Sequence, residues 1–288
     1  LLDTSILRYI ILKFYMKKST NNSMSIALGT IQYQLGEKPV LGYGLSLSTS
    51  DLDSALEGSI PEVVFDDKGK ADIHSLLMGV AETGFEKSEI ERILTREEGV
   101  ENWRVGEALA EVYLVHHKDC FFPWPDGRDE RKTGSSLPGA DLVGFQSIDG
   151  EDFFVFGEVK TSNENTYPPS LMHGRTGLKQ QLEDLRDNDK IKDDLFLYLG
   201  YRATTAPWKS RYENAAKKYI QQKNNVRIFG LLVRDVSPHQ DDLRARVNKL
   251  TQNIPSDMII ELLAIYLPNN TISSLGRRVK NSRNKGSI

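Results

Sequence analysis

The fold is decided by residues 137–162, which read LPGADLVGFQSIDGEDFFVFGEVKTS. Two apolar runs flank Asp149-Gly150, a dipeptide that favours the tight turn of a β-hairpin. The second run, Phe153–Gly157, is apolar at successive positions, as in a strand that is buried on both faces. The sequence therefore predicts an antiparallel hairpin at the centre of the fold.

This turn predicts which residues face one another across the hairpin. If the hairpin closes symmetrically about Asp149-Gly150, the numbers of paired residues sum to 299, so Glu158 faces Asp141. Directly opposed residues on one face have Cβ atoms about 4.5–5.5 Å apart. Lys160 projects from the same face as Glu158, because side chains alternate along a strand. Two carboxylates and an ammonium group are thus expected at one place.

Such a group of side chains suits metal-assisted hydrolysis. Two carboxylates this close repel each other unless a cation neutralises them. Hard oxygen ligands of this kind suit Mg²⁺ or Mn²⁺, with water and a substrate phosphate in the remaining positions. Lys160 can orient or deprotonate an attacking water and offset the charge that develops on the phosphate. The pattern indicates phosphodiester hydrolysis by Asp141, Glu158 and Lys160.

An acid followed two positions later by lysine is a weak signal, because the chain contains it three times. Asp66–Lys68 and Glu130–Lys132 lie in charged, turn-rich segments that are expected to be exposed. Glu158–Lys160 instead ends an apolar strand, where burial of two charged side chains needs a reason. Context therefore favours the third occurrence.

The remaining pattern predicts alternating strands and helices. Strands are expected around residues 31–35, 41–47, 195–201 and 226–233. A turn-rich acidic loop is expected through Asp66 and Gly69. Helices are expected at residues 73–80, 87–94, 103–117, 178–186 and 208–222, and the helix–strand order repeats at 241–251 and 258–267. We therefore predict an α/β fold in which helices flank a central mixed β-sheet.

No internal repeat or long low-complexity linker divides the chain, so one domain is the economical interpretation. We expect a core at residues 101–270 and an accessory region at 24–100 that packs on it. Residues 1–23 are interpreted as an N-terminal extension, since Met16 or Met24 is a candidate start. The basic residues after Ser273 predict a flexible tail at 271–288, which either touches phosphates or is merely solvated.

Composition narrows the class of protein. The 288 residues carry 37 Lys and Arg against 40 Asp and Glu, so contact with a polyanion must come from a local patch. The single cysteine, Cys120, cannot form a disulfide within the chain, and no Cys/His cluster has zinc-site spacing, which fits a reducing cytoplasm. The apolar run at 6–16 is too short to span a bilayer. We expect a cytoplasmic protein that does not enter a membrane.

A family resemblance appears at the same residues. Pro138–Asp141 followed by Gly157–Lys160 resembles the PD-(D/E)xK nuclease superfamily, over roughly residues 103–201. Gly139-Ala140 stands where a proline often precedes the aspartate, which departs from the family pattern. The resemblance implies a restriction-endonuclease-like core that cuts DNA with Mg²⁺ or Mn²⁺, in which Lys160 assists the water. It implies a metal site made by Asp141, Glu158 and Val159.

In that superfamily an upstream helix commonly supplies another glutamate. Gly106-Glu107, within the predicted helix at 103–117, resembles this motif and makes Glu107 a further catalytic candidate. Glu111 lies on the same polar stripe and stays possible. The alternative is a stripe that faces solvent, with Arg104 paired to Glu107.

Other candidates lie on both sides of the hairpin. Gln181 stands in the helix after the catalytic strand, where some members of the superfamily place a glutamine that touches the site. Residues that we expect to contact nucleic acid are Arg128, Arg131, Lys132, Arg175 and Lys179. The alternative is that these cations are solvated, whereas Trp124 and Trp208 are interpreted as packing residues.

Ser135–Phe145, together with the chain length, is similar to the nuclease subunit of Hachiman-type bacterial anti-phage systems. This resemblance implies a helicase partner and a role in defence. A type II restriction endonuclease is the nearest enzymatic alternative. The alternative from another class is a non-catalytic nucleic-acid-binding subunit that kept the nuclease fold.

Overall fold

A single mixed β-sheet of seven strands organises the computed structural model, which describes residues 25–94, 99–125, 128 and 139–285. The strands follow the order β1-β2-β7-β6-β5-β4-β3 across the sheet. Their bounds are β1 Thr30–Glu37, β2 Val40–Ser46, β3 Cys120–Phe121, β4 Leu142–Ile148, β5 Glu151–Ser162, β6 Arg227–Arg234 and β7 Ile259–Tyr266. Strands β2, β7, β6 and β5 run parallel to one another, whereas β1 pairs antiparallel with β2 on one side, and β4 with β5 and β3 with β4 on the other.

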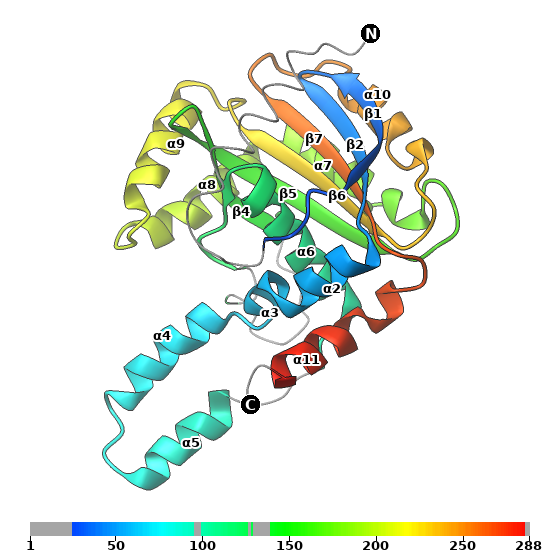
Figure 1. The fold of residues 1–288 in the computed structure, drawn as a ribbon. Coiled ribbons are helices and arrows are strands. Elements are labelled where there is room, and N and C mark those ends of the chain that lie inside the picture. Colours follow the sequence, from blue (N-terminus) through cyan, green and yellow to red (C-terminus); the bar gives the residue numbers. More distant parts are fainter. Residues whose placement is uncertain (1–24, 95–98, 126–127, 129–138, 286–288) are drawn as a thin grey trace.

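Helices cover both faces of this sheet (Figure 1). The helices on one face are α2 Thr49–Glu57, α3 Ser59–Val64, α6 Asn102–His117 and α11 Leu275–Lys285. Those on the other face are α7 Leu178–Asp187, α8 Asp189–Ala203, α9 Lys209–Gln221 and α10 Arg244–Leu250. Short 3-10 turns occur at Ser170–Met172, Gln240–Asp242 and Ile272–Ser274. The predicted α/β fold with a helix-flanked mixed sheet is confirmed.

Two further helices, α4 Asp67–Met78 and α5 Gly84–Leu94, stand apart from these layers. Figure 1 shows them side by side, projecting away from the sheet. Asp66 caps the start of α4, where its carboxylate accepts a hydrogen bond from the Gly69 amide at 3.2 Å. The segment through Asp66 and Gly69 was expected to be a loop, but it is the start of this helix.

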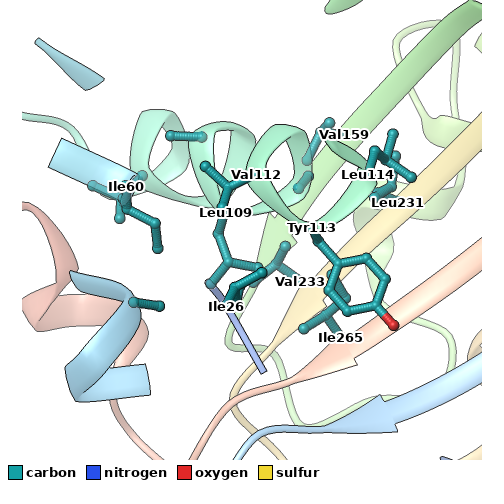
Figure 2. Close-up of a cluster of buried hydrophobic side chains, with 14 of the residues drawn as sticks. Ile26, Ile60, Leu109, Val112, Tyr113, Leu114, Val159, Leu231, Val233 and Ile265 are labelled. Atoms are coloured by element: carbon teal, nitrogen blue, oxygen red, sulfur yellow. The ribbon is translucent and has the colours of Figure 1, made fainter. Parts of the chain in front are cut away.

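Helix α6 is the central element of the first core, which Figure 2 shows. Its apolar side chains pack over the sheet against residues that include Val159, Val233 and Ile265. Gly106 lets the helix approach β5 closely, since a Cβ at this position would lie 2.0 Å from the Thr161 hydroxyl oxygen. The odd-numbered residues of β5 therefore face α6.

The hairpin has the predicted register. Every pair from Leu142 with Gly157 to Ile148 with Glu151 sums to 299. Asp149 and Gly150 form the turn with φ of 52° and 83°, the left-handed conformations that a tight hairpin turn of this kind requires. The central element of the sequence prediction is confirmed.

One predicted strand is wrong. Residues 195–201 lie inside α8, where Leu195 and Leu199 face a second apolar core, between the sheet and helices α7–α10, and Leu197 and Tyr201 are exposed. Leu195 and Leu199, four residues apart, lie on the buried side of the helix, and Leu197 and Tyr201 lie on its exposed side. This division of the apolar run between two sides is typical of a helix at the surface of a protein.

Two expectations about the ends of the fold also need correction. The region at 24–100 is not only an accessory layer, because β1 and β2 belong to the central sheet. The tail at 271–288 was expected to be flexible, but residues 275–285 form α11, with Leu275 and Val279 buried in the first core. Arg278 also contacts Asp53 of α2. The extension at 1–23 lies outside the described residues.

Candidate active site

The β4–β5 hairpin brings the two predicted acids together. Asp141 directly precedes β4, whose ladder ends at the pair Leu142 with Gly157, so Asp141 and Glu158 are the next residue beyond this pair on each strand. The Asp141 carboxylate accepts a hydrogen bond from the Val159 amide at 2.7 Å. The side chain of Asp141 is therefore fixed against β5 beside Glu158.

Glu158 is the most buried of the three predicted catalytic side chains, with 1% of its side chain exposed. Its Oε2 atom is buried without a hydrogen-bond partner among the described residues. Lys160 Nζ lies 3.5 Å from this atom. Burial, followed by the negative charge of Asp141, raises the pKa of Glu158 to about 9, although the Lys160 ammonium acts in the opposite direction. The Lys160 ammonium therefore does not offset the effects that raise the pKa of Glu158.

Helix α7 covers this part of the sheet. Gly230 of β6 pairs with Glu158, and a Cβ at Gly230 would lie 2.7 Å from the Leu182 side chain of α7. The absence of a side chain at Gly230 thus lets α7 lie close to the sheet beside Glu158. Lys160, with 19% of its side chain exposed, contacts both the buried Glu158 carboxylate and solvent.

The residues present suit a divalent cation only in part. Among the residues described, no group of three or more His, Cys, Asp or Glu side chains is placed to hold a metal ion. Asp141 and Glu158 supply two carboxylates, and Val159 can supply only its main-chain carbonyl. The Oε2 atom that lacks a hydrogen bond and the raised pKa of Glu158 are the observations that fit a cation at this point. Water and substrate phosphate would have to complete its coordination.

The two glutamates of α6 have different surroundings. Glu107 has contacts of its own but forms no metal-holding group with Asp141 and Glu158 in the described structure. Burial, together with the charge of Asp66, raises the pKa of Glu111 to about 7, and Arg104 opposes this effect. Glu158 and Lys160, as even-numbered residues of β5, project from the face that α7 covers, whereas α6 covers the opposite face. The structure does not place Glu107 or Glu111 with the acid pair.

Gln181 lies on α7, the helix that covers Glu158. Its Oε1 atom is buried and has no hydrogen-bond partner among the described residues. Lys179, also on α7, is partly buried, and Arg175 in the preceding loop is exposed. These three residues therefore lie at or just before the start of the helix on the site's face of the sheet.

Arg128 is held by another part of the protein. Its guanidinium donates two hydrogen bonds to the Asp66 carboxylate, both 2.7 Å long, and lies 5.1 Å from the centre of the Trp124 ring. Arg128 thus joins the segment after β3 to the start of α4. Arg131 and Lys132, which were also expected to contact nucleic acid, lie outside the described residues.

Sequence reasoning missed a buried ion pair beyond the ends of the parallel strands. Arg234 Nη1 donates to Asp242 Oδ1 at 3.0 Å, and both side chains are fully buried. Arg234 Nη2 also donates to the carbonyl of Thr166 at 3.1 Å, in the loop that follows β5. Tyr266 donates to Asp242 Oδ2 at 2.7 Å. The sequence feature that could have indicated this ion pair is Arg234, a charged residue at the end of the apolar strand β6.

Comparisons with known proteins add no assignment. No protein-family model matches this chain, and a search of curated proteins found no significant match. Among the described helices, none combines the length and the apolar character that crossing a membrane requires. The positions of Asp141, Glu158 and Lys160 and the resemblance of their motif are therefore what points to a function.

Proposed function

We propose that this protein is a metal-dependent nuclease that hydrolyses phosphodiester bonds of DNA. The observation that carries the proposal is the meeting of Asp141, Glu158 and Lys160 on one face of the β4–β5 hairpin. A buried carboxylate, Glu158, beside a second carboxylate and with one nearby ammonium is costly for a fold, and perturbed acids of this kind cluster at functional sites.

Each side chain has a role that follows from its position. Asp141 and Glu158, with the Val159 carbonyl, would hold Mg²⁺ or Mn²⁺. The bound cation would act as a Lewis acid on the phosphate and lower the pKa of a coordinated water. Asp141 is oriented by the Val159 amide at 2.7 Å. Because Lys160 lies 3.5 Å from Glu158 and reaches solvent, it can orient the attacking water and stabilise negative charge on the phosphate oxygens.

The resemblance of Ser135–Phe145 to the Hachiman nuclease subunit extends the proposal to a role in anti-phage defence. In that role the protein would act in the cytoplasm with a helicase partner that delivers or restrains it. DNA is proposed as the substrate because the motif of the acid pair resembles DNA-cutting members of the superfamily.

A cleavage assay tests the proposed chemistry. Linear, circular and single-stranded DNA are incubated with Mg²⁺ or Mn²⁺ and with the parent protein, Glu158→Ala or Lys160→Ala. We expect both variants to lose at least about a hundredfold in rate, as is usual when a catalytic charge is removed. Lys68→Ala is the matched control, because Lys68 belongs to another acid-x-lysine sequence but is exposed on α4.

Three outcomes distinguish the alternatives. Equal cutting by the parent, Glu158→Ala and Lys160→Ala would exclude the proposed site. Cutting of one short sequence by the purified protein alone would favour a type II restriction endonuclease. Binding of DNA without cutting, with and without a helicase partner, would favour the non-catalytic subunit.

A further inference from the structure

The α4–α5 pair carries apolar side chains that are exposed in the part of the chain that the structure describes. Five of them are exposed by 49–82%, and we call this set the hairpin stripe: Ile73, Leu76, Val80, Phe85 and Ile93. Ile90 is the one buried apolar side chain among the described residues of α4 and α5. Two helices that bury so little of their apolar surface gain little stability from their own packing.

The stripe has a regular arrangement. Ile73 and Leu76, three residues apart, lie on one side of α4, and Val80 follows four residues later in the turn after the helix. Phe85 and Ile93 lie about two turns apart on α5, next to α4 in space. Figure 1 shows that the α4–α5 pair extends away from the sheet, so another molecule can reach it.

The charges around the stripe disfavour a nucleic acid as its occupant. Residues 67–94 carry six Asp and Glu against four Lys and Arg. Several of these charges are already paired within the two helices: Arg92 bonds to Glu89, and His74 bonds to Glu91 at 2.8 Å. An apolar stripe beside internally paired charges suits another protein surface.

The exposed area fits a second copy of this chain. At about 30 Å² for each methylene and about 180 Å² for an aromatic side chain, the exposed fractions give roughly 400 Å² of apolar surface. A standard protein interface buries about 800 Å² on each partner, a little over half of it apolar. The hairpin stripe of each copy therefore supplies nearly the apolar area that one partner buries in a standard interface.

From this surface we infer that two copies of the protein associate through their α4–α5 pairs, with the two hairpin stripes packed against each other around a two-fold axis. Four helices then enclose side chains that one copy leaves in water, as in a small helical bundle. The interface is isologous, so each residue of the stripe meets the stripe of the other copy.

The oligomeric state of the purified full chain tests this inference. We expect a concentration-dependent dimer in sedimentation velocity and light scattering. Leu76→Glu and Phe85→Glu should raise the dimer dissociation constant by at least about tenfold, because each puts a charge into an apolar interface. Ile220→Glu is the matched control, since Ile220 on α9 is 73% exposed but lies outside the stripe.

Disulfide formation gives a second measurement. Cys120 is buried, so Leu76→Cys introduces an exposed thiol near the middle of the stripe, and oxidation should link two copies covalently. Ile220→Cys should not be linked under the same conditions. A parent that stays monomeric at all concentrations overturns the inference. So does a dimer that Leu76→Glu and Phe85→Glu leave intact, because that dimer uses another surface.

Discussion

The raised pKa of Glu158 makes the stability of the metal-free protein depend on pH. The pKa of the Glu158 carboxyl is about 9 in the folded protein, whereas the ordinary pKa of a glutamate is 4.5. Between these values the folded state binds one more proton than the unfolded state, so stability falls as the pH rises. This loss of stability is absent below about pH 4.5 and complete above about pH 9.

The size of this effect follows from the shift. Each pKa unit corresponds to about 1.4 kcal/mol, so the shift from 4.5 to about 9 lowers the free energy of unfolding by at most about 6 kcal/mol. At pH 7.5 the loss is about 4 kcal/mol. These are upper limits, because Lys160 can move closer to the carboxylate when Glu158 ionises. We expect Glu158→Gln to remove the loss, since the amide fills the same space without a titratable proton.

Urea unfolding of the parent and Glu158→Gln from pH 5 to 9, without divalent ions, measures the effect. The two free energies of unfolding should differ little at pH 5, and the variant should become increasingly more stable toward pH 9. Glu261→Gln serves as a control, because Glu261 is a buried carboxylate on β7 that contacts the Lys118 ammonium. Parallel curves for the parent and Glu158→Gln would refute the reasoning about this site.

Three more predictions concern other parts of the fold. Arg234→Met should lower the free energy of unfolding by about 3–5 kcal/mol in urea, because it leaves the Asp242 carboxylate buried without its cation. Gly106→Ala should destabilise by about 1–3 kcal/mol in thermal unfolding, since its Cβ would overlap Thr161 and separate α6 from β5. Glu111→Gln should remove a fall in stability between about pH 4.5 and 7, because the folded-state pKa is raised to about 7. An unchanged pH profile for Glu111→Gln would show that this carboxyl is solvated.

The part of the site that could be predicted is the part that local pairing determines. A two-residue turn fixes the register of β4 and β5, so the positions of Asp141, Glu158 and Lys160 followed from the sequence alone. Nothing local determines which helix covers each face of the sheet. The motif resemblance suggested Glu107 for the site, but α6 packs on the opposite face from Glu158.

The errors in the fold arose where pattern and tertiary context disagree. Residues 195–201 are apolar at almost every position, and such a short run fits a buried strand as well as a helix. The basic composition after Ser273 hid Leu275 and Val279, whose spacing of four residues places both in the first core. The parallel pairing of β2 with β7 joins residues that are more than 200 positions apart, which no local pattern reveals.

The tight turn at Asp149-Gly150 also has a consequence for the order of folding. Hairpins with short loops form within about 1–10 μs, whereas contacts between distant segments form later. The acidic side chains can therefore become neighbours while water still surrounds them. Their desolvation occurs only when the distant strand β6 and the helix α7 arrive, so the most costly step of building this centre belongs to late assembly.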